Sequence, residues 1–214
     1  MVANIVIGFK TLPGREGEGL GILRDFAAYL EGFGAQATAY RALYAGDLTD
    51  RINVLAVTQD TAERAVLVDK LIADGANSPL AKAVWSPSPP LAIASRVLSR
   101  SIEPDLPMLP QSPVRVFRGF VAAPGRRGEV EQALRDARVR HEGLGVRAGG
   151  FVVEEGGPVT GHYLYIGAHD SLAAYEEFGR KNAALSAPMP LVAAMDGGAM
   201  ALTVGRIDVR LDLG

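Results

Sequence analysis

An internal repeat constrains the fold of this chain more than any other feature of its sequence. When the 214-residue sequence is shifted by 111 residues, Gly8 to Thr49 aligns with Gly119 to Thr160 without a gap, and 16 of 42 positions are identical. A duplication of this length predicts two copies of one small folding unit. We therefore predict an N-terminal repeat at residues 1–103 and a C-terminal repeat at residues 114–214. Residues 104–113 contain four prolines, a composition typical of an extended linker between the repeats.

The glycine-rich stretch LPGREGEGLG, residues 12–21, has the composition of a phosphate-binding loop but not its spacing. A dinucleotide fingerprint requires G-x-G-x-x-G, and a P-loop requires Gly-Lys followed by Ser or Thr; the stretch contains neither pattern. The feature that both repeats share is the pair Pro13-Gly14, which recurs as Pro124-Gly125. Proline fixes φ and glycine tolerates a positive φ, so we interpret both pairs as turns from a strand into a helix.

Each repeat shows the same order of strand and helix signals. Short runs rich in β-branched and aromatic residues predict strands, and apolar residues at three-to-four spacing predict amphipathic helices. In the first repeat the predicted strands are 4–11, 35–44, 51–58 and 91–100, with helices at 18–31 and from Asp60 or Thr61. In the second repeat they are 114–122, 146–155, 162–168 and 199–211, with helices at 129–141 and from Asp170 or Ser171. We expect AGDLTD at 45–50 and GGPVTG at 156–161 to form hairpin turns.

The order β-α-β-β-α-β in each repeat predicts fold class α+β, with two tandem ferredoxin-like units. Such a unit packs both helices on one face of a four-stranded sheet and leaves the other face bare. Here the bare face is apolar, because Tyr163 and Tyr165 alternate with Leu164 and Ile166 along one strand. An exposed apolar face of this size is uncommon in monomers. We therefore predict that the two sheets pack face to face as an intrachain eight-stranded α+β barrel.

This architecture, with a Pro-Gly turn after the first strand of each unit, resembles the dimeric α+β barrel superfamily. Members include cofactor-independent antibiotic biosynthesis monooxygenases, haem-binding chlorite dismutase-like proteins and stress-response barrels. Several members carry a His-Pro pair after the second helix, where this chain has Ser78-Pro79 and Ala187-Pro188. The resemblance implies the fold and a small-molecule ligand, and it does not supply a catalytic histidine.

Composition narrows the possible partners and location. A net charge of -2 and a pI near 5.9 give no broad attraction to nucleic acid or to anionic membranes. The chain has no cysteine, so it has no thiolate nucleophile and no zinc ribbon. Its apolar runs are shorter than the ~20 residues that span a bilayer. We expect a cytoplasmic protein without nucleic-acid or membrane partners, and we expect a homo-oligomer because barrels of this kind often associate further.

All three histidines lie in the second repeat, so we place any catalysis there. His141 falls on the apolar stripe of its helix, where a structural role and a pocket role are both open. His162 begins a strand, and His169 lies at a strand-to-helix junction beside Asp170; for both, a surface or capping role competes with catalysis. The spacing of these residues matches no compact metal motif, so we predict no metal ligand and no cofactor. Should haem bind, His141 or His162 would be the axial ligand.

A pocket inside the barrel is our hypothesis for the site. If the helices cover the alternate residues of strand 162–168, Tyr163 and Tyr165 face the barrel interior. Phe9 and Phe120 of the first strands would then line an aromatic cavity, and Arg118 would give it one cationic end. The alternative is that these tyrosines fill a core and that the arginines protect strand ends.

Three further residues complete the predicted binding set. Arg96 and Arg206 occur in the last strand of each repeat, and we align them as equivalents. A charge within a strand needs compensation if it is buried, which makes both arginines candidates for holding an anion. Trp85, the only tryptophan, either lines a pocket mouth or acts as a buried packing anchor.

Two functions of different classes remain open from the sequence. The first is a cofactor-independent monooxygenase or isomerase of a small aromatic or polyketide-like molecule. In that enzyme, proton transfer would involve His141, His162, Tyr163 and Tyr165, and an arginine would hold developing negative charge. The alternative is a noncatalytic small-molecule-binding or regulatory module. A cavity between the sheets that holds a histidine or tyrosine with a shifted pKa beside an arginine would favour the enzyme.

Overall fold

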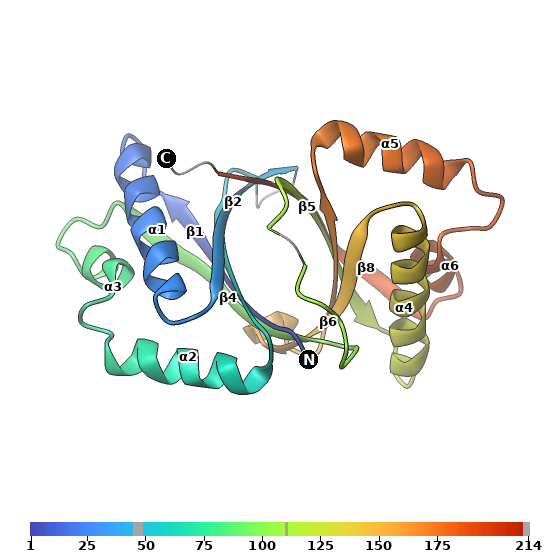
Figure 1. The fold of residues 1–214 in the computed structure, drawn as a ribbon, viewed down its shortest axis with the longest axis horizontal. Helices are drawn as coiled ribbons and strands as arrows, with labels where there is room; N and C mark the ends of the chain where they lie inside the picture. Colours follow the sequence, from blue (N-terminus) through green and yellow to red (C-terminus); the bar gives the residue numbers. More distant parts are fainter. Residues whose placement is uncertain (45–48, 110, 212–214) are drawn as a thin grey trace.

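The structure, a computed structural model, describes residues 1–44, 49–109 and 111–211. The first repeat consists of β1 (Ala3–Thr11), α1 (Glu16–Glu31), β2 (Gln36–Tyr44), β3 (Ile52–Thr58), α2 (Thr61–Ala73), α3 (Pro79–Val84) and β4 (Leu91–Ser101). The second consists of β5 (Val114–Ala122), α4 (Arg127–Gly143), β6 (Arg147–Glu155), a 3-10 turn η2 (Gly157–Val159), β7 (Tyr163–His169), α5 (Leu172–Ala183), α6 (Pro190–Asp196) and β8 (Met200–Arg210). The predicted order of strands and long helices is confirmed, and the short helices α3 and α6 were not predicted (Figure 1).

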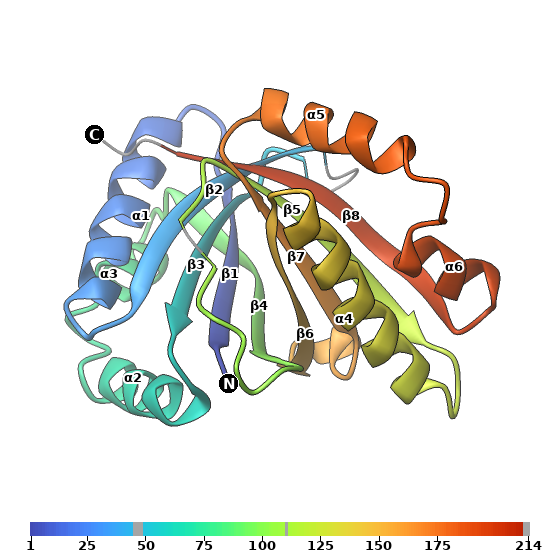
Figure 2. The same cartoon turned by 45° about the vertical axis from the view of Figure 1, so that its right-hand side comes forward.

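The eight strands form one closed barrel in the order β1-β3-β2-β8-β5-β7-β6-β4. Each repeat supplies four neighbouring strands, and the two sheets join where β2 pairs with β8 and where β4 pairs with β6. The helices lie outside the ring, those of the first repeat on one side and those of the second on the other (Figures 1 and 2). The predicted intrachain eight-stranded α+β barrel is confirmed.

The turn glycines and helix N-caps have the conformations that the sequence predicts. The repeated turn glycines Gly14 and Gly125 have φ of 76° and 78°, the left-handed region that glycine enters without a steric penalty. The N-cap of α2 is Asp60, whose side chain accepts a hydrogen bond from the Glu63 backbone N–H, and the N-cap of α5 is Ser171. The predicted turn at 45–50 lies mostly outside the described residues, whereas the one at 156–161 contains η2.

Loss of the α5 cap gives a first testable prediction. The Ala174 backbone N–H donates to Ser171 Oγ at 3.0 Å, and a Ser171→Ala variant leaves this N–H without its partner. We expect the free energy of unfolding to fall by about 1 kcal/mol, measured by urea denaturation. A Ser171→Asp variant keeps an acceptor and should stay close to the parent. Equal losses in both variants would show that the cap contributes nothing.

The register of the last strands corrects one predicted equivalence. In the first repeat, Ile7 on β1 pairs with Arg96 on β4. Its counterpart in the second repeat is Arg118 on β5, which pairs with Gly205 on β8. Arg96 is therefore equivalent to Gly205, and Arg206 is equivalent to the residue after Arg96. The alignment of Arg96 with Arg206 was wrong by one residue, because the connection before β8 is two residues shorter than the one before β4. A one-residue slip moves a side chain to the opposite face of a strand, so the two arginines face different surroundings.

Three separate apolar cores hold the molecule together. One lies between the first sheet and its helices, and the second lies between the second sheet and its helices. The third is inside the barrel, where side chains of both sheets meet, including Val6, Leu55, Phe117 and Phe151. Leu106 and Leu109 of the segment between β4 and β5 are buried in this third core. Figures 1 and 2 show that segment crossing the ring of strands, so the connection between the repeats is also part of the barrel's filling.

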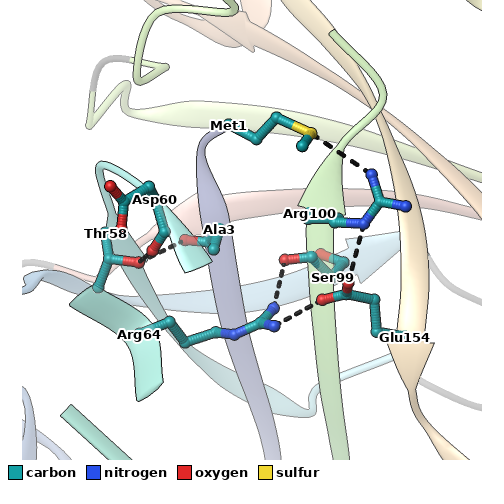
Figure 3. A network of polar contacts seen from close by, with 8 residues as sticks. All are labelled: Met1, Ala3, Thr58, Asp60, Arg64, Ser99, Arg100 and Glu154. Atoms are coloured by element: carbon teal, nitrogen blue, oxygen red, sulfur yellow. Dashed lines mark hydrogen bonds and ion pairs between the residues drawn. The ribbon is translucent and has the colours of Figure 1, made fainter. Parts of the chain in front are cut away.

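A polar network stabilises one seam between the repeats (Figure 3). Glu154 on β6 accepts hydrogen bonds from Arg64 Nη2 at 2.5 Å and from Arg100 Nε at 2.8 Å, and both arginines belong to the first repeat. Arg64 Nη1 also donates to the Ser99 backbone carbonyl at 3.0 Å. One carboxylate thus ties α2 and β4 of the first repeat to β6 of the second.

Across the described ranges, no helix is long and apolar enough to cross a membrane. Association into homo-oligomers stays a prediction.

Candidate active site in the C-terminal repeat

The side chains of β7 point in the opposite directions to those of our hypothesis. Tyr163 and Tyr165 pack in the core between the second sheet and its helices, whereas Leu164 and Ile166 face the barrel interior. Phe9 and Phe120 likewise belong to the two helix-side cores. The expectation that these aromatic residues line the barrel was wrong. Both faces of β7 are apolar, so alternation along the strand does not indicate which face the helices cover.

The tyrosine face contributes to a cavity of about 200 Å³, which we call the helix-side pocket. Strands β5 and β7 form its floor, and α4, α5 and the start of α6 surround it. Its polar and ionisable lining residues are Arg118, His141, Tyr165, His169, Tyr175 and Asn182. This pocket therefore brings together three residues that the sequence analysis singled out for a site, namely Arg118, His141 and Tyr165.

Comparison of the two repeats shows how the second makes room for this pocket. Shifting by 111 residues pairs β1, α1, β3 and α2 with β5, α4, β7 and α5. The first repeat has Ile7, Leu30, Val54, Thr58, Val68 and Leu71 where the second has Arg118, His141, Tyr165, His169, Gly179 and Asn182. All but Thr58 of the first set pack in the helix-side core of their repeat. The second repeat has exchanged packed apolar side chains for polar groups and for a glycine that leaves space.

His141 is a neutral imidazole with a defined tautomer. It lies on α4, is 5% exposed, and its Nδ1 lies 2.7 Å from the carbonyl oxygen of Ala137, one turn earlier in the helix. A carbonyl only accepts, so Nδ1 carries the hydrogen and Nε2 is left as an acceptor. Burial lowers the pKa of His141 to about 4, and the nearby charges of Arg140 and Arg118 act in the same direction. At neutral pH this side chain is therefore unprotonated.

Tyr165 and His169 are buried, and each has a polar atom without a hydrogen bond to the described residues. The Tyr165 hydroxyl and His169 Nδ1 are shielded from solvent and have no hydrogen-bond partner among the described residues. The Tyr165 ring meets the His141 ring edge to face, with centroids 5.1 Å apart. Burial raises the pKa of Tyr165 and lowers the pKa of His169, so both groups are neutral. A buried donor without a partner costs about 1–3 kcal/mol, which a bound polar ligand would recover.

Arg118 places a positive charge at the edge of the same pocket. It crosses the neighbouring strand at Gly205, where a Cβ atom would stand only 3.0 Å from Arg118 Nη1. Glycine at this position therefore leaves the space that the guanidinium occupies. Gly167 on β7 acts similarly for His169, because a Cβ there would lie 3.4 Å from Nε2. The pocket thus offers a proton acceptor, a neutral phenol and a cation around one small cavity.

The predicted space between the two sheets also exists, with different lining residues. We call it the barrel cavity, and its volume is about 340 Å³. His162 and Arg206 line it, together with residues of both repeats such as Val6 and Leu164. The candidate residues are therefore divided between two cavities on opposite faces of the second sheet. His141 and Tyr165 are in the helix-side pocket, and His162 is in the barrel cavity.

The remaining candidates lie in neither cavity. The Tyr163 hydroxyl donates to Glu131 at 2.9 Å and accepts from Arg127, near the exposed edge of α4. Phe9 and Phe120 are fully buried packing residues. Arg96 is exposed and forms an ion pair with Glu155. Trp85 is 78% exposed, which excludes the packing role that the sequence suggested.

His169, Gly179 and Asn182 are among the pocket residues that were not recognised in the sequence. His169 was interpreted as a surface or capping residue, but it is buried and stacks edge to face against Tyr175, with ring centroids 5.3 Å apart. Gly179 and Asn182 were not considered at all. The signal that identifies all three is the internal alignment, because each differs in size or polarity from an otherwise equivalent position in the first repeat.

The fold and the two cavities define a two-repeat protein with the dimeric α+β barrel fold. No protein-family model matches the sequence, and no curated protein matches it. Among solved structures, one provisionally named a chlorite dismutase has 12% identity and a TM-score of 0.63, with 100% of this chain and 96% of that chain covered.

Two other solved structures give the same result. An anthrone oxidase-like protein has 12% identity and a TM-score of 0.59, covering 98% of this chain and 91% of its own. A provisionally named monooxygenase from Lactobacillus acidophilus has 8% identity and a TM-score of 0.58, covering 98% and 94%. At such identities the likeness establishes the fold.

The likeness to chlorite dismutases raises the question of whether the helix-side pocket fits haem. A histidine ligand from this pocket would be His141 through Nε2, since its Nδ1 is bound to Ala137, or His169. The Phe178 ring lies only 4.4 Å from the His141 ring, centroid to centroid. The cavity of about 200 Å³ is also below the roughly 300–1,000 Å³ of sites for drug-sized ligands, and haem is larger than those. Haem therefore does not fit the pocket in this conformation.

In the described part of the chain, no three His, Asp or Glu residues are grouped as metal ligands.

Proposed function

We propose that the helix-side pocket is the active site of a cofactor-independent monooxygenase or isomerase. Its substrate would be a small aromatic or polyketide-like molecule with an enolisable ketone or phenol. The observation that carries the proposal is the set Arg118, His141 and Tyr165, which lines a cavity that the first repeat fills with apolar side chains. The fold likeness to an anthrone oxidase-like protein and to provisionally named monooxygenases supports the same class.

The proposed chemistry begins with a proton transfer from the substrate to His141 Nε2. The oxygen of the resulting enolate becomes negatively charged, and the Tyr165 hydroxyl and the Arg118 guanidinium are the groups able to donate to it. Return of the proton at another atom completes an isomerisation. In the oxygenase case O2 is the oxidant: a methylene carbon loses two hydrogens and becomes a carbonyl, and the second oxygen atom leaves as water.

Hydrogen exchange at carbon tests the first step with a simple enolisable ketone in place of the natural substrate. We would incubate the protein with 2-tetralone in D2O without oxygen and follow loss of the α-proton signals by NMR. The parent protein is expected to accelerate this exchange above the buffer rate. His141→Leu should reduce the acceleration about 10²–10⁴-fold, since a positioned general base contributes this much. Tyr165→Phe should reduce it about 10²–10³-fold through loss of the donor to the enolate oxygen.

The control for these substitutions is Tyr29→Phe on α1, where the hydroxyl donates to Asp74 at 2.7 Å, in the other repeat. This variant should exchange protons at the parent rate. Oxygen uptake in the same mixture, measured with an electrode, then separates the oxygenase from the isomerase. If a panel of enolisable ketones binds saturably but exchanges no faster than in buffer, the pocket is a noncatalytic binding site and the enzymatic proposal is wrong.

A further inference from the structure

The barrel cavity is a second, chemically different pocket. It lies between the sheets, toward the end of the barrel where β3 and β7 begin, as its lining residues Arg51 and His162 show. Toward the opposite end, Leu106 and Leu109 pack with Val2 inside the ring. The segment between β4 and β5 therefore fills one end of the barrel, and the cavity is left at the other end.

The wall of this cavity is apolar and comes from both repeats. It is formed mainly by Val6, Val97, Phe117, Val153, Val159, Leu164 and Val204. Gly119 contributes no side chain, and a Cβ there would collide with Val204 Cγ1 at 2.5 Å. An apolar space of about 340 Å³ is within the size range of small-molecule sites.

The polar groups of the cavity are cationic or neutral. The Arg206 guanidinium lies over the Phe117 ring at 4.3 Å, and its Nε is 2.7 Å from Asp208 Oδ1. Although Nε and Oδ1 lie this close, both atoms are buried without a well-aligned hydrogen bond among the described residues. Arg51 adds a second cation, and His162 Nδ1 is shielded from solvent and has no hydrogen-bond partner in the described part of the chain. Among the described residues that line the cavity, none is acidic.

A buried carboxylate lies beside Arg206. Burial raises the pKa of Asp208, and the nearby charges of Arg206 and Arg115 lower it. Arg206 thus shares this carboxylate with a second arginine. The position equivalent to Arg206 in the first repeat is Val97, so the guanidinium over Phe117 has no counterpart on the equivalent strand of the first repeat. An apolar space with an arginine fork at one wall fits a molecule with an apolar body and a planar anionic head.

We propose that the barrel cavity binds a medium-chain carboxylate, with the alkyl chain along the apolar wall and the carboxylate at Arg206 and His162. Small inorganic anions would leave the apolar wall unfilled, and neutral lipids would leave the guanidinium nitrogens without an acceptor. The helix-side pocket lies on the other face of the second sheet, so this proposal does not depend on the proposed function.

Titration calorimetry with decanoate below its micellar concentration tests the proposal on the full chain. Decanoate should bind saturably with one molecule per chain, hexanoate should bind more weakly, and decylammonium should not bind. Arg206→Gln should raise the Kd about 10- to 100-fold, the equivalent of one charge-assisted hydrogen bond. Tyr165→Phe should leave the Kd unchanged, so failure here is distinguishable from failure of the proposed function.

A second variant covers the case in which Arg206→Gln does not fold. Val159 is half-buried in η2 at the cavity, and Val159→Trp narrows the cavity without removing a charge. It should abolish decanoate binding, whereas the matched Val66→Trp at an exposed position of α2 should not. The proposal is overturned if decanoate does not bind the parent protein, if decylammonium binds as tightly, or if Val159→Trp binds like the parent.

Discussion

An Asp208→Ala variant is expected to lose about 3–5 kcal/mol of its free energy of unfolding, the cost of breaking a buried ion pair. Asp208 is 0% exposed and lies between two arginines inside the barrel. Arg206 Nε is 2.7 Å away, and Arg115, itself only 2% exposed, interacts with it electrostatically. Without the carboxylate, Arg206 loses the acidic group in contact with its guanidinium, in a space from which water is largely excluded. Urea denaturation followed by circular dichroism measures the loss.

The duplication supplies a matched control for this prediction. Ser99 occupies the equivalent position on β4, is also fully buried, and its hydroxyl has no hydrogen-bond partner among the described residues. Ser99→Ala should therefore change the free energy of unfolding by less than about 1 kcal/mol. The double variant Arg206→Met with Asp208→Leu should regain part of the stability, because it removes the cation in contact with Asp208 together with the carboxylate, and apolar replacements of a buried pair are often neutral. A single Asp208→Ala variant as stable as the parent would show that the arginines need no counter-charge.

The fold was predictable because its determinants are local and occur twice. Pro13-Gly14 and Pro124-Gly125 specify the same turn, and the strand and helix patterns follow in the same order in each repeat. An apolar face on each sheet then leaves few ways to exclude water. The error occurred at β8, where a connection two residues shorter moved the register by one relative to the simple alignment of the two strands. Strand register depends on pairing partners, which a sequence pattern does not show.

The site was less predictable, since it depends on which face of a strand the helices cover. Tyr165 and Leu164 are both compatible with burial, and only the packing of α4 and α5 assigns one to each side. Histidine provides the clearest sequence signal: His141 replaces Leu30, and burying an imidazole in place of a leucine carries a cost. The space beside His141 could not be predicted from the second repeat alone. Gly179 indicates it only when compared with Val68, the residue at the equivalent position of the first repeat.

Stability should fall steeply as the pH decreases, and His141 should account for a separable part of that fall. Its pKa in the folded state is about 4, below the ordinary value of 6.5, because burial disfavours the charged imidazole. Above pH 6.5 the side chain is neutral in both the folded and the unfolded state. Between pH 6.5 and 4 the unfolded chain takes up the proton first, so stability is lost as the pH falls through this range. At 1.36 kcal/mol per pH unit, the loss at pH 4 from this residue is about 3 kcal/mol.

The difference between His141→Leu and the parent protein isolates this contribution, because the other titrating groups, His169 included, are common to both. The gain in stability of His141→Leu over the parent should grow by about 3 kcal/mol between pH 7 and pH 4. The first repeat permits the reverse experiment. Leu30 is equally buried at the equivalent position of α1, so Leu30→His should introduce a pH dependence of the same sign. A constant difference between His141→Leu and the parent over this range would mean that His141 takes up its proton at the same pH in the folded and unfolded states, and that burial does not lower its pKa.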